Sequence, residues 1–222
     1  MSQIGGHPCA VRYPNEVLQA PMRRVCQQLR LRGVDLSQAR ALEFFAREGD
    51  WQTVSYAGEV ASLEAWEIEP HCEPALRRNL PGATIRMGDS YQLARLPEYA
   101  GAFDLVVLDN PQVIFGPQGE HCEHFDALEL MPNLLGGAGT LIFNVNYAPF
   151  NYHQQPAWQQ RRRDFCGREA TDRLEFEFLQ TFYAEFFDRR GRATEFMFFE
   201  PRHEQVIAYA VMRLRAQTTG PV

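Results

Sequence analysis

The sequence predicts an α/β fold: a mostly parallel sheet with an antiparallel edge. Short apolar runs alternate with longer helical stretches, which is typical of strand–helix–strand units. The last two apolar runs, 193–199 and 205–212, are joined by residues 200–204 alone. A connection this short makes an antiparallel hairpin, because a parallel partner needs a crossover of about a dozen residues or more. With 222 residues, 45% of them hydrophobic, the chain can bury one continuous core, and we expect a single domain.

The predicted elements follow from the spacing of apolar residues. A helix is expected over 15–31, and Asp35 can cap a short helix or turn after it. The apolar runs before the hairpin have the length of buried strands: 41–45, 65–68, 83–87, 103–108 and 139–145. Helical segments fit at 52–63, 71–80 and 123–135, with a long helix within 156–189.

Charge argues against a general affinity for nucleic acid. The net charge is −6, from 28 acidic and 22 basic residues, so no overall field attracts a phosphate backbone. A local exception is the run Arg161-Arg162-Arg163, followed by Arg168 and Arg173. Because a charge run on a helix is usually a solvated face, we favour that interpretation.

Membrane and redox features point to the cytoplasm. No apolar run approaches the roughly 18 residues of a membrane-spanning helix, and the N-terminus lacks the regions of a signal peptide. The five cysteines are odd in number and form no CxxC pair. We therefore expect free thiols, no structural zinc, no membrane association and a cytoplasmic location.

The first candidate motif follows the strand predicted at 41–45. In an open parallel sheet, ligands bind beyond the carboxyl ends of the strands. Residues 42–53 place an acid before a turn that contains Gly49, and they resemble the first motif of class I S-adenosylmethionine-dependent methyltransferases. Gly49 is the only one of that motif's usual glycines retained here, at a turn where backbone approaches the cofactor closely. The resemblance implies cofactor contacts from Glu43, Phe44, Ala46, Gly49 and Trp51.

The second candidate motif is an acid at the end of the next predicted strand. Glu67 lies 18 residues after Gly49, and an acid about 20 residues beyond such a turn suits a ribose, whose two hydroxyls donate to one carboxylate. We expect Glu67 to hold the cofactor ribose, with Ile68 beside it. An acid that merely ends a strand at the surface is the alternative.

The third motif, Gly88-Asp89-Ser90, resembles the adenine-contacting motif of the same family. A carboxylate there accepts from the exocyclic amine while a backbone amide donates to the ring. The three motifs together imply a Rossmann-like seven-stranded sheet with helices on both faces. They also imply S-adenosylmethionine as cofactor and S-adenosylhomocysteine as product. Within the domain we expect a helical substrate cover (1–35), a cofactor-binding core (36–147), and a substrate-side helix with the hairpin (148–222).

The reaction side is expected after the strand at 103–108. Asn110-Pro111 resembles the start of the Asn-Pro-Pro-aromatic motif of methyltransferases that act on amines, in which an amide oxygen and a backbone carbonyl accept the N–H bonds of the nucleophile. Such acceptors orient the lone pair and stabilise developing charge. Gln112 and Val113 depart from that motif. We expect catalytic roles for Asp109 and Asn110, and a cofactor contact from Asp109.

Two histidines in the following loop are further catalytic candidates. His121 and His124 could take a proton near neutral pH, although simple loop polarity also explains them. With Asp126 they are too few to predict a metal site. Aromatic and polar residues near this point are expected to contact substrate: Tyr13, Pro111, Gln112, Phe115, Tyr147 and Tyr152.

The leading functional hypothesis is methyl transfer from S-adenosylmethionine to an N or O atom of a small molecule or peptide side chain. One alternative is a catalytically silent partner or regulatory protein with this fold, because the first motif is poor in glycine. Another is a nucleic-acid methyltransferase, suggested by Asn110-Pro111 and the arginine run. An oligomer is possible, since the apolar strand 193–199 could face the core or a partner.

Overall fold

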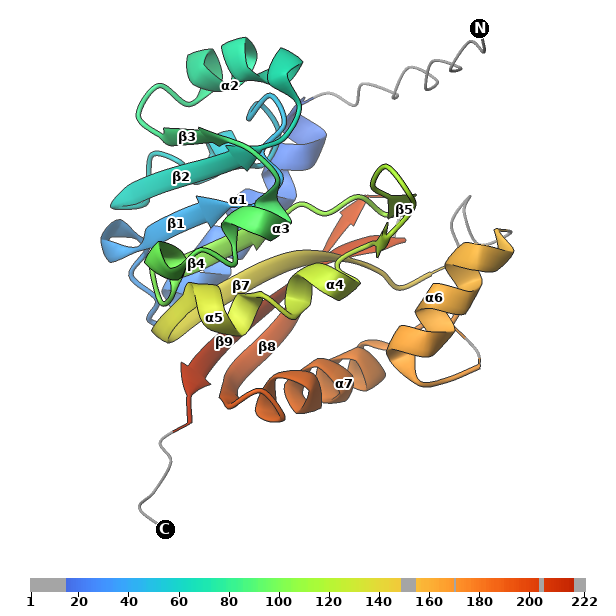
Figure 1. The fold of residues 1–222 in the computed structure, drawn as a ribbon. Helices are drawn as coiled ribbons and strands as arrows, with labels where there is room; N and C mark the ends of the chain where they lie inside the picture. The colour runs from blue at the N-terminus through green and yellow to red at the C-terminus, as the bar shows by residue number, and fades with distance from the viewer. Residues whose placement is uncertain (1–14, 149–154, 170, 204–205, 218–222) are drawn as a thin grey trace, which may run out of the picture.

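The structure, a computed structural model, describes residues 15–148, 155–169, 171–203 and 206–217. Its centre is a seven-stranded sheet in the order β3-β2-β1-β4-β7-β9-β8 (Figure 1). Parallel pairing joins five of these strands: β1 (Arg40–Glu43), β2 (Ser62–Glu67), β3 (Thr84–Met87), β4 (Phe103–Leu108) and β7 (Leu135–Asn146). β9 (Ile207–Ala216) runs antiparallel to both β7 and β8 (Arg192–His203). The predicted Rossmann-like sheet with an antiparallel C-terminal hairpin is confirmed.

Helices cover both faces of the sheet, as predicted. Apolar side chains of α1 (Asn15–Leu31) and α2 (Glu73–Asn79) pack with one set of strand residues, which includes Ala41, Leu105 and Val107. The alternate strand residues Leu42, Val106 and Leu108 belong to the opposite cluster. Five helices contribute to that cluster: α3 (Ser90–Leu93), α4 (Phe125–Leu128), α5 (Met131–Leu134), α6 (Pro156–Cys166) and α7 (Phe176–Asp188). A parallel strand buried on both faces explains why the sequence shows continuous apolar runs there.

Smaller elements complete the described chain. α6 (Pro156–Cys166) lies toward the end of the sheet where the parallel strands finish, near the hairpin of β5 (Ile114–Phe115) and β6 (His121–Cys122) (Figure 1). Four 3₁₀ helices lie in the connections: η1 (Leu36–Gln38), η2 (Thr53–Ser55), η3 (Pro70–Cys72) and η4 (Pro97–Tyr99). No helix in the described ranges is both long and apolar enough to cross a bilayer. The four cysteines in the described part, Cys26, Cys72, Cys122 and Cys166, are free and buried.

Several helix predictions are confirmed and three need correction. The helix at 15–31 and the cap at Asp35, whose carboxylate accepts from Ser37 N at 3.0 Å, are present, and 71–80 is covered by η3 and α2. The helix predicted at 52–63 is wrong, because only η2 forms there. Gly58 and the β-branched residues Thr53, Val54 and Val60 give this segment weak helix propensity.

The other two corrections concern helix breaks. The long helix predicted within 156–189 is two helices, because Gly167 ends α6 in the left-handed conformation with φ 64°. The segment 123–135 also contains two short helices, and Pro132 lies in the first turn of the second one, where its missing N–H costs nothing. Both breaks occur at a residue type that ordinarily ends or starts a helix.

Candidate active site

The predicted cofactor residues gather at the carboxyl ends of β1, β2 and β3. The chain passes from β1 to β2 on one side of the sheet, whereas β4 pairs with β1 on the other side. In open parallel α/β sheets, a reversal of strand order of this kind is where a crevice for the ligand is expected. The loops that follow Glu43, Glu67, Met87 and Leu108 all begin at this edge.

The carboxylate of Glu67 is fixed at the end of β2 by backbone amides. Its Oε2 accepts from Arg47 N at 2.6 Å, and its Oε1 accepts from Glu69 N at 2.7 Å. A carboxylate oxygen has two lone pairs, so each retains capacity for one hydroxyl of a diol. Glu67 is 5% exposed, whereas the next residue, Ile68, is 58% exposed. An oriented acid thus lies beside an exposed apolar side chain.

The turn after β1 brings its backbone against β2. Ala46 N donates to Trp66 O at 3.0 Å, and Arg47 adopts a positive φ of 47°. Gly49 has φ 68°, and a Cβ there would lie 2.7 Å from a methyl carbon of Leu76. Glycine is therefore required at position 49 both by its dihedral angle and by the contact with α2.

The Gly88-Asp89-Ser90 motif connects three strand ends. Gly88 N donates to Glu67 O at 2.8 Å, and Ser90 Oγ donates to Phe44 O at 2.6 Å. Asp89 is the N-cap of α3, because its Oδ1 accepts from Tyr91 N at 2.9 Å. These bonds hold the loops after β1, β2 and β3 in a fixed relation.

Glu43, the last residue of β1, is completely buried beside η2. Gln52 Nε2 donates to its Oε1 at 3.0 Å, and the Tyr56 hydroxyl donates to its Oε2. Burial raises the pKa of Glu43 to about 8, and the charge of Asp109 adds to the shift. The side chain is therefore largely protonated at neutral pH. Trp51, another predicted cofactor residue, lies in the same connection with its ring 4.7 Å from Arg47 Cζ.

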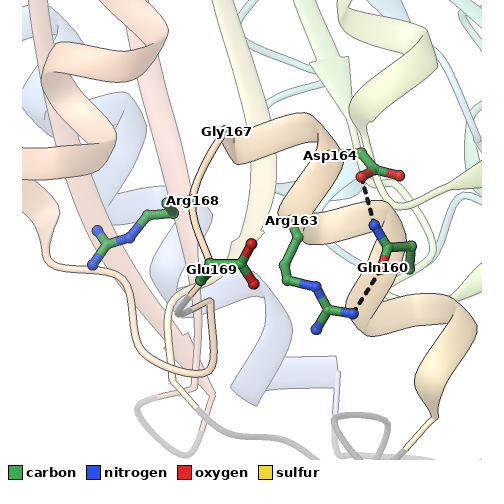
Figure 2. A pocket seen from close by; sticks show the side chains of 6 residues that line it. All are labelled: Gln160, Arg163, Asp164, Gly167, Arg168 and Glu169. Carbon is green, nitrogen blue, oxygen red and sulfur yellow. Dashed lines mark hydrogen bonds between the residues drawn. The ribbon is translucent and has the colours of Figure 1, made fainter.

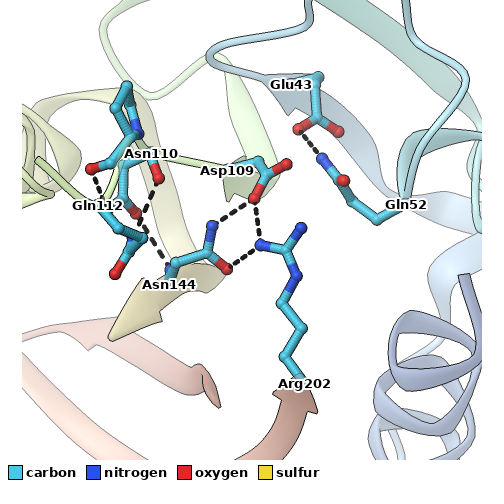
Figure 3. Close-up of polar contacts among 8 residues, drawn as sticks. Glu43, Gln52, Asp109, Asn110, Gln112, Asn144 and Arg202 are labelled. Carbon is cyan, nitrogen blue, oxygen red and sulfur yellow. Dashed lines mark hydrogen bonds and ion pairs between the residues drawn. The ribbon is translucent and has the colours of Figure 1, made fainter. Parts of the chain in front are cut away.

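Asp109 forms an ion pair with an arginine of the C-terminal hairpin (Figure 3). Arg202 Nη1 lies 2.5 Å from Asp109 Oδ1 and 2.7 Å from Asn144 Oδ1, and the Asn144 amide also donates to Asp109. The side chains of Arg202 and Asp109 are 8% and 7% exposed. The end of β8 is thereby tied to the ends of β4 and β7.

Asn110 makes its amide contacts within the protein. Its Oδ1 accepts from Asn144 N at 3.1 Å, and its backbone oxygen accepts from Gln112 Nε2 at 3.0 Å (Figure 3). The residue is 3% exposed, and Pro111 after it is half-buried. The amide oxygen that the resemblance implies as an acceptor therefore already holds one donor, and it keeps a second lone pair.

The two candidate histidines occupy different environments. His121 stacks on Tyr91 with ring centroids 3.8 Å apart and packs against Phe115, and its Nδ1 lies 3.3 Å from Asp126 Oδ2. His124 is 1% exposed, with Nε2 2.6 Å from Tyr183 Oη. Burial lowers the pKa of His124 well below its ordinary value. His121 is thus the more accessible member of the pair.

Of the aromatic residues expected at the substrate, Tyr147 packs on Phe176 with ring centroids 4.8 Å apart. Tyr13 and Tyr152 lie outside the described residues.

The arginines of the run 161–163 bind different partners within the protein. Arg162 is 3% exposed at the side chain and forms an ion pair with buried Glu123 at 2.8 Å. Arg161 donates to the backbone oxygens of Gly119 and Glu120. The expectation of a solvated face is therefore wrong for Arg162, whose charge is compensated inside the protein.

A surface hollow lies at the C-terminal end of α6 (Figure 2). Arg163 donates to Gln160 Oε1 at 2.8 Å, and Gln160 donates to Asp164 Oδ1 at 2.7 Å. None of the residues predicted to hold cofactor or substrate lines this hollow, whose lining is Gln160, Arg163, Asp164, Gly167, Arg168 and Glu169.

The sequence did not point to several polar residues at the strand ends. Arg202 is 93 residues from Asp109, and it falls in the connection expected to be a simple turn. Gln52 and Tyr56 fall in a segment expected to be a regular helix. Asn144 was a signal of such a polar cluster, because it interrupts an apolar strand and a buried amide requires hydrogen-bond partners.

Comparison with known proteins identifies the fold. No family model and no curated protein matches the sequence. Trm1 from Pyrococcus horikoshii, solved with S-adenosyl-L-methionine, superposes with a TM-score of 0.65 at 14% identity, covering 95% of this chain and 58% of that one. The chain thus spans under two thirds of the Trm1 structure.

Two shorter structures match over more of their own length. A putative sarcosine dimethylglycine methyltransferase from Galdieria sulphuraria gives a TM-score of 0.56 at 12% identity, covering 93% of this chain and 92% of that one. The 1,6-didemethyltoxoflavin-N1-methyltransferase from Burkholderia thailandensis, with bound 1,6-didemethyltoxoflavin and S-adenosylhomocysteine, gives 0.54 at 18% identity, covering 90% and 79%. These similarities show that the chain has the class I methyltransferase fold.

Proposed function

We propose that this protein transfers a methyl group from S-adenosylmethionine to an N or O atom of a small molecule or peptide side chain. The observation that carries the proposal is the carboxylate of Glu67, oriented by two backbone amides beside the exposed Ile68. The Trm1 and toxoflavin methyltransferase structures, which share the fold, contain S-adenosylmethionine or its product.

The residues of the crevice suit the parts of this cofactor. Glu67 would accept the ribose hydroxyls, and Ile68 offers an apolar surface to the adenine. The cofactor supplies an activated methyl group, so the protein has to hold the acceptor in line with it and exclude water. Asp109 and Asn110 follow β4, where the reaction side is expected. A hydrogen bond from the nucleophile to either residue would orient the lone pair of the nucleophile.

A small or peptide acceptor fits the charges better than nucleic acid does. The net charge is −6, and all three arginines of the run 161–163 donate to protein acceptors. Nucleic-acid affinity depends on several cations free to contact phosphates. The arginine run offers few of them.

Titration calorimetry with S-adenosylmethionine and S-adenosylhomocysteine tests the cofactor assignment. We expect both to bind, and Glu67→Ala to weaken binding by about 30-fold or more, because hydrogen bonds to a charged group contribute about 1.5–3 kcal/mol each. Glu98→Ala, at an exposed position in η4, is the control and should bind normally. Failure of wild type to bind either compound, or equal affinities of the two variants, would contradict the proposal.

Methyl transfer is tested separately with cofactor that carries a labelled methyl group. We expect label to enter small-molecule or peptide fractions of a cell extract. Tight cofactor binding without transfer to any fraction would instead support the catalytically silent alternative.

A further inference from the structure

Three side chains with metal-binding atoms meet where the turn after β1 approaches η3. Glu48 lies in the turn after β1, and His71 and Cys72 lie in η3. One ligand atom from each, a carboxylate oxygen, an imidazole nitrogen and a sulfur, lies within 4.8 Å of the other two. Because the residues come from two separate loops, their sequence spacing gives no metal-binding pattern.

The distance between the sulfur and the nitrogen suits zinc. Cys72 Sγ lies 3.5 Å from His71 Nε2. A tetrahedral zinc ion with Zn–S of about 2.3 Å and Zn–N of about 2.0–2.1 Å separates these atoms by about 3.6 Å. The pair is therefore placed to bind one ion with little movement, and a carboxylate oxygen of Glu48 lies within 4.8 Å of both atoms as the third candidate ligand.

The other nitrogen of His71 also has a suitable partner. His71 Nδ1 lies 3.6 Å from Glu69 Oε2. Histidines that bind metal generally direct their second nitrogen to a carboxylate or carbonyl, which fixes the ring and makes the ligand more basic. Glu69 occupies that outer position, leaving Nε2 directed toward Cys72.

The local charge favours a cation. Glu48 brings a carboxylate to the cluster, and Glu69 places a second one 3.6 Å from His71. A divalent ion bound there would stabilise the Cys72 thiolate directly. Arg47 Nε, 3.6 Å from Glu48 Oε2, is the competing cation, and its side chain is 51% exposed.

We propose that Glu48, His71 and Cys72 form a zinc site with a fourth position open to water. The ion would connect the turn after β1 to the start of η3, the two loops whose amides hold Glu67. The site would therefore stabilise the loops around the crevice. The proposal does not depend on the assignment of the cofactor or of the reaction.

Titration of the metal-free full-length protein with Zn²⁺ and with Co²⁺ tests the site. We expect one ion per chain, a thiolate-to-cobalt absorption band, and a higher Tm with Zn²⁺. His71→Ala, at an exposed position, should weaken Zn²⁺ binding at least about 10-fold, and Cys72→Ser should abolish the thiolate band. Cys166→Ser removes another buried thiol and should behave as wild type.

The proposal is overturned by either of two results. One is an unchanged Zn²⁺ affinity in a folded His71→Ala variant. The other is a cobalt complex of the wild-type protein without the thiolate band. Because neither measurement involves S-adenosylmethionine, failure of the zinc site is distinguishable from failure of the proposed enzyme activity.

Discussion

At the residue scale, Gly49 is constrained by two independent features. Its φ of 68° disfavours any side chain, and an added Cβ would lie 2.7 Å from Leu76 and 2.8 Å from Leu80. We expect Gly49→Ala to lower the free energy of unfolding by about 2–4 kcal/mol, from the dihedral strain and the overpacking together. Gly58→Ala is the matched control, because nothing lies within 4 Å of its Cβ position. Chemical denaturation that shows equal losses for both variants would contradict this account.

Glu43 should make stability depend on pH. Its pKa is about 8 in the folded protein against an ordinary value of 4.5, so between these values the folded state holds a proton that the unfolded state has released. Its contribution to stability is complete below pH 4.5 and is lost as the pH rises through 8.

The test compares wild type with Glu43→Gln, which stays neutral. Between pH 5 and pH 8.5, we expect wild type to lose more unfolding free energy than the variant, by on the order of 2–4 kcal/mol. Denaturant titrations at the two pH values provide the measurement. If the two proteins lose stability in parallel, Glu43 does not carry the pH dependence.

At the scale of elements, the ion pair between Arg202 and Asp109 joins the β8–β9 hairpin to the end of β4. Removing one partner of a buried pair leaves the other charge uncompensated. We expect Arg202→Met to lower the free energy of unfolding by about 3–5 kcal/mol. Adding Asp109→Asn should restore much of the loss, because the double variant has no unpaired charge. Additive losses in this double-mutant cycle would show that the pair is not coupled.

The elements that the sequence predicted well are those defined by local patterns. β4 forms over the predicted residues 103–108, because its apolar run is buried on both faces. The segment after β1 was mispredicted because its conformation is set by tertiary contacts: Gln52 and Tyr56 turn inward to satisfy the buried Glu43. Helical periodicity contains no information about such a partner.

The difference between features set by local sequence patterns and features set by tertiary contacts also applies to the candidate site. Glu67 and Asp89 could be located because parallel strands end at one edge of a sheet, so each strand end identifies a position in the crevice. Arg202 could not, because it reaches Asp109 only after the hairpin has paired with β7. Glu48 and Cys72 also meet only through the packing of two loops.

At the scale of the whole molecule, the two sheet faces are packed by separate helices, whereas the crevice is built from loops. Backbone bonds already join the loops after β1, β2 and β3, among them Gly88 N to Glu67 O at 2.8 Å. The proposed cofactor would add contacts across these same loops. β1 and β2 beneath them are mostly buried, whereas β3, at the edge of the sheet, is only partly covered.

Hydrogen exchange with and without S-adenosylhomocysteine should therefore show a localised response. We expect slower exchange in 44–52, 67–72 and 88–93, because a ligand that bridges these loops suppresses their local opening. The remote helix α7 should be nearly unchanged, and Glu67→Ala at the same ligand concentration should lose most of the protection. Slowing concentrated in α6 and α7 would place the ligand elsewhere, since a compound bound there would leave the loops after β1 and β2 free to open.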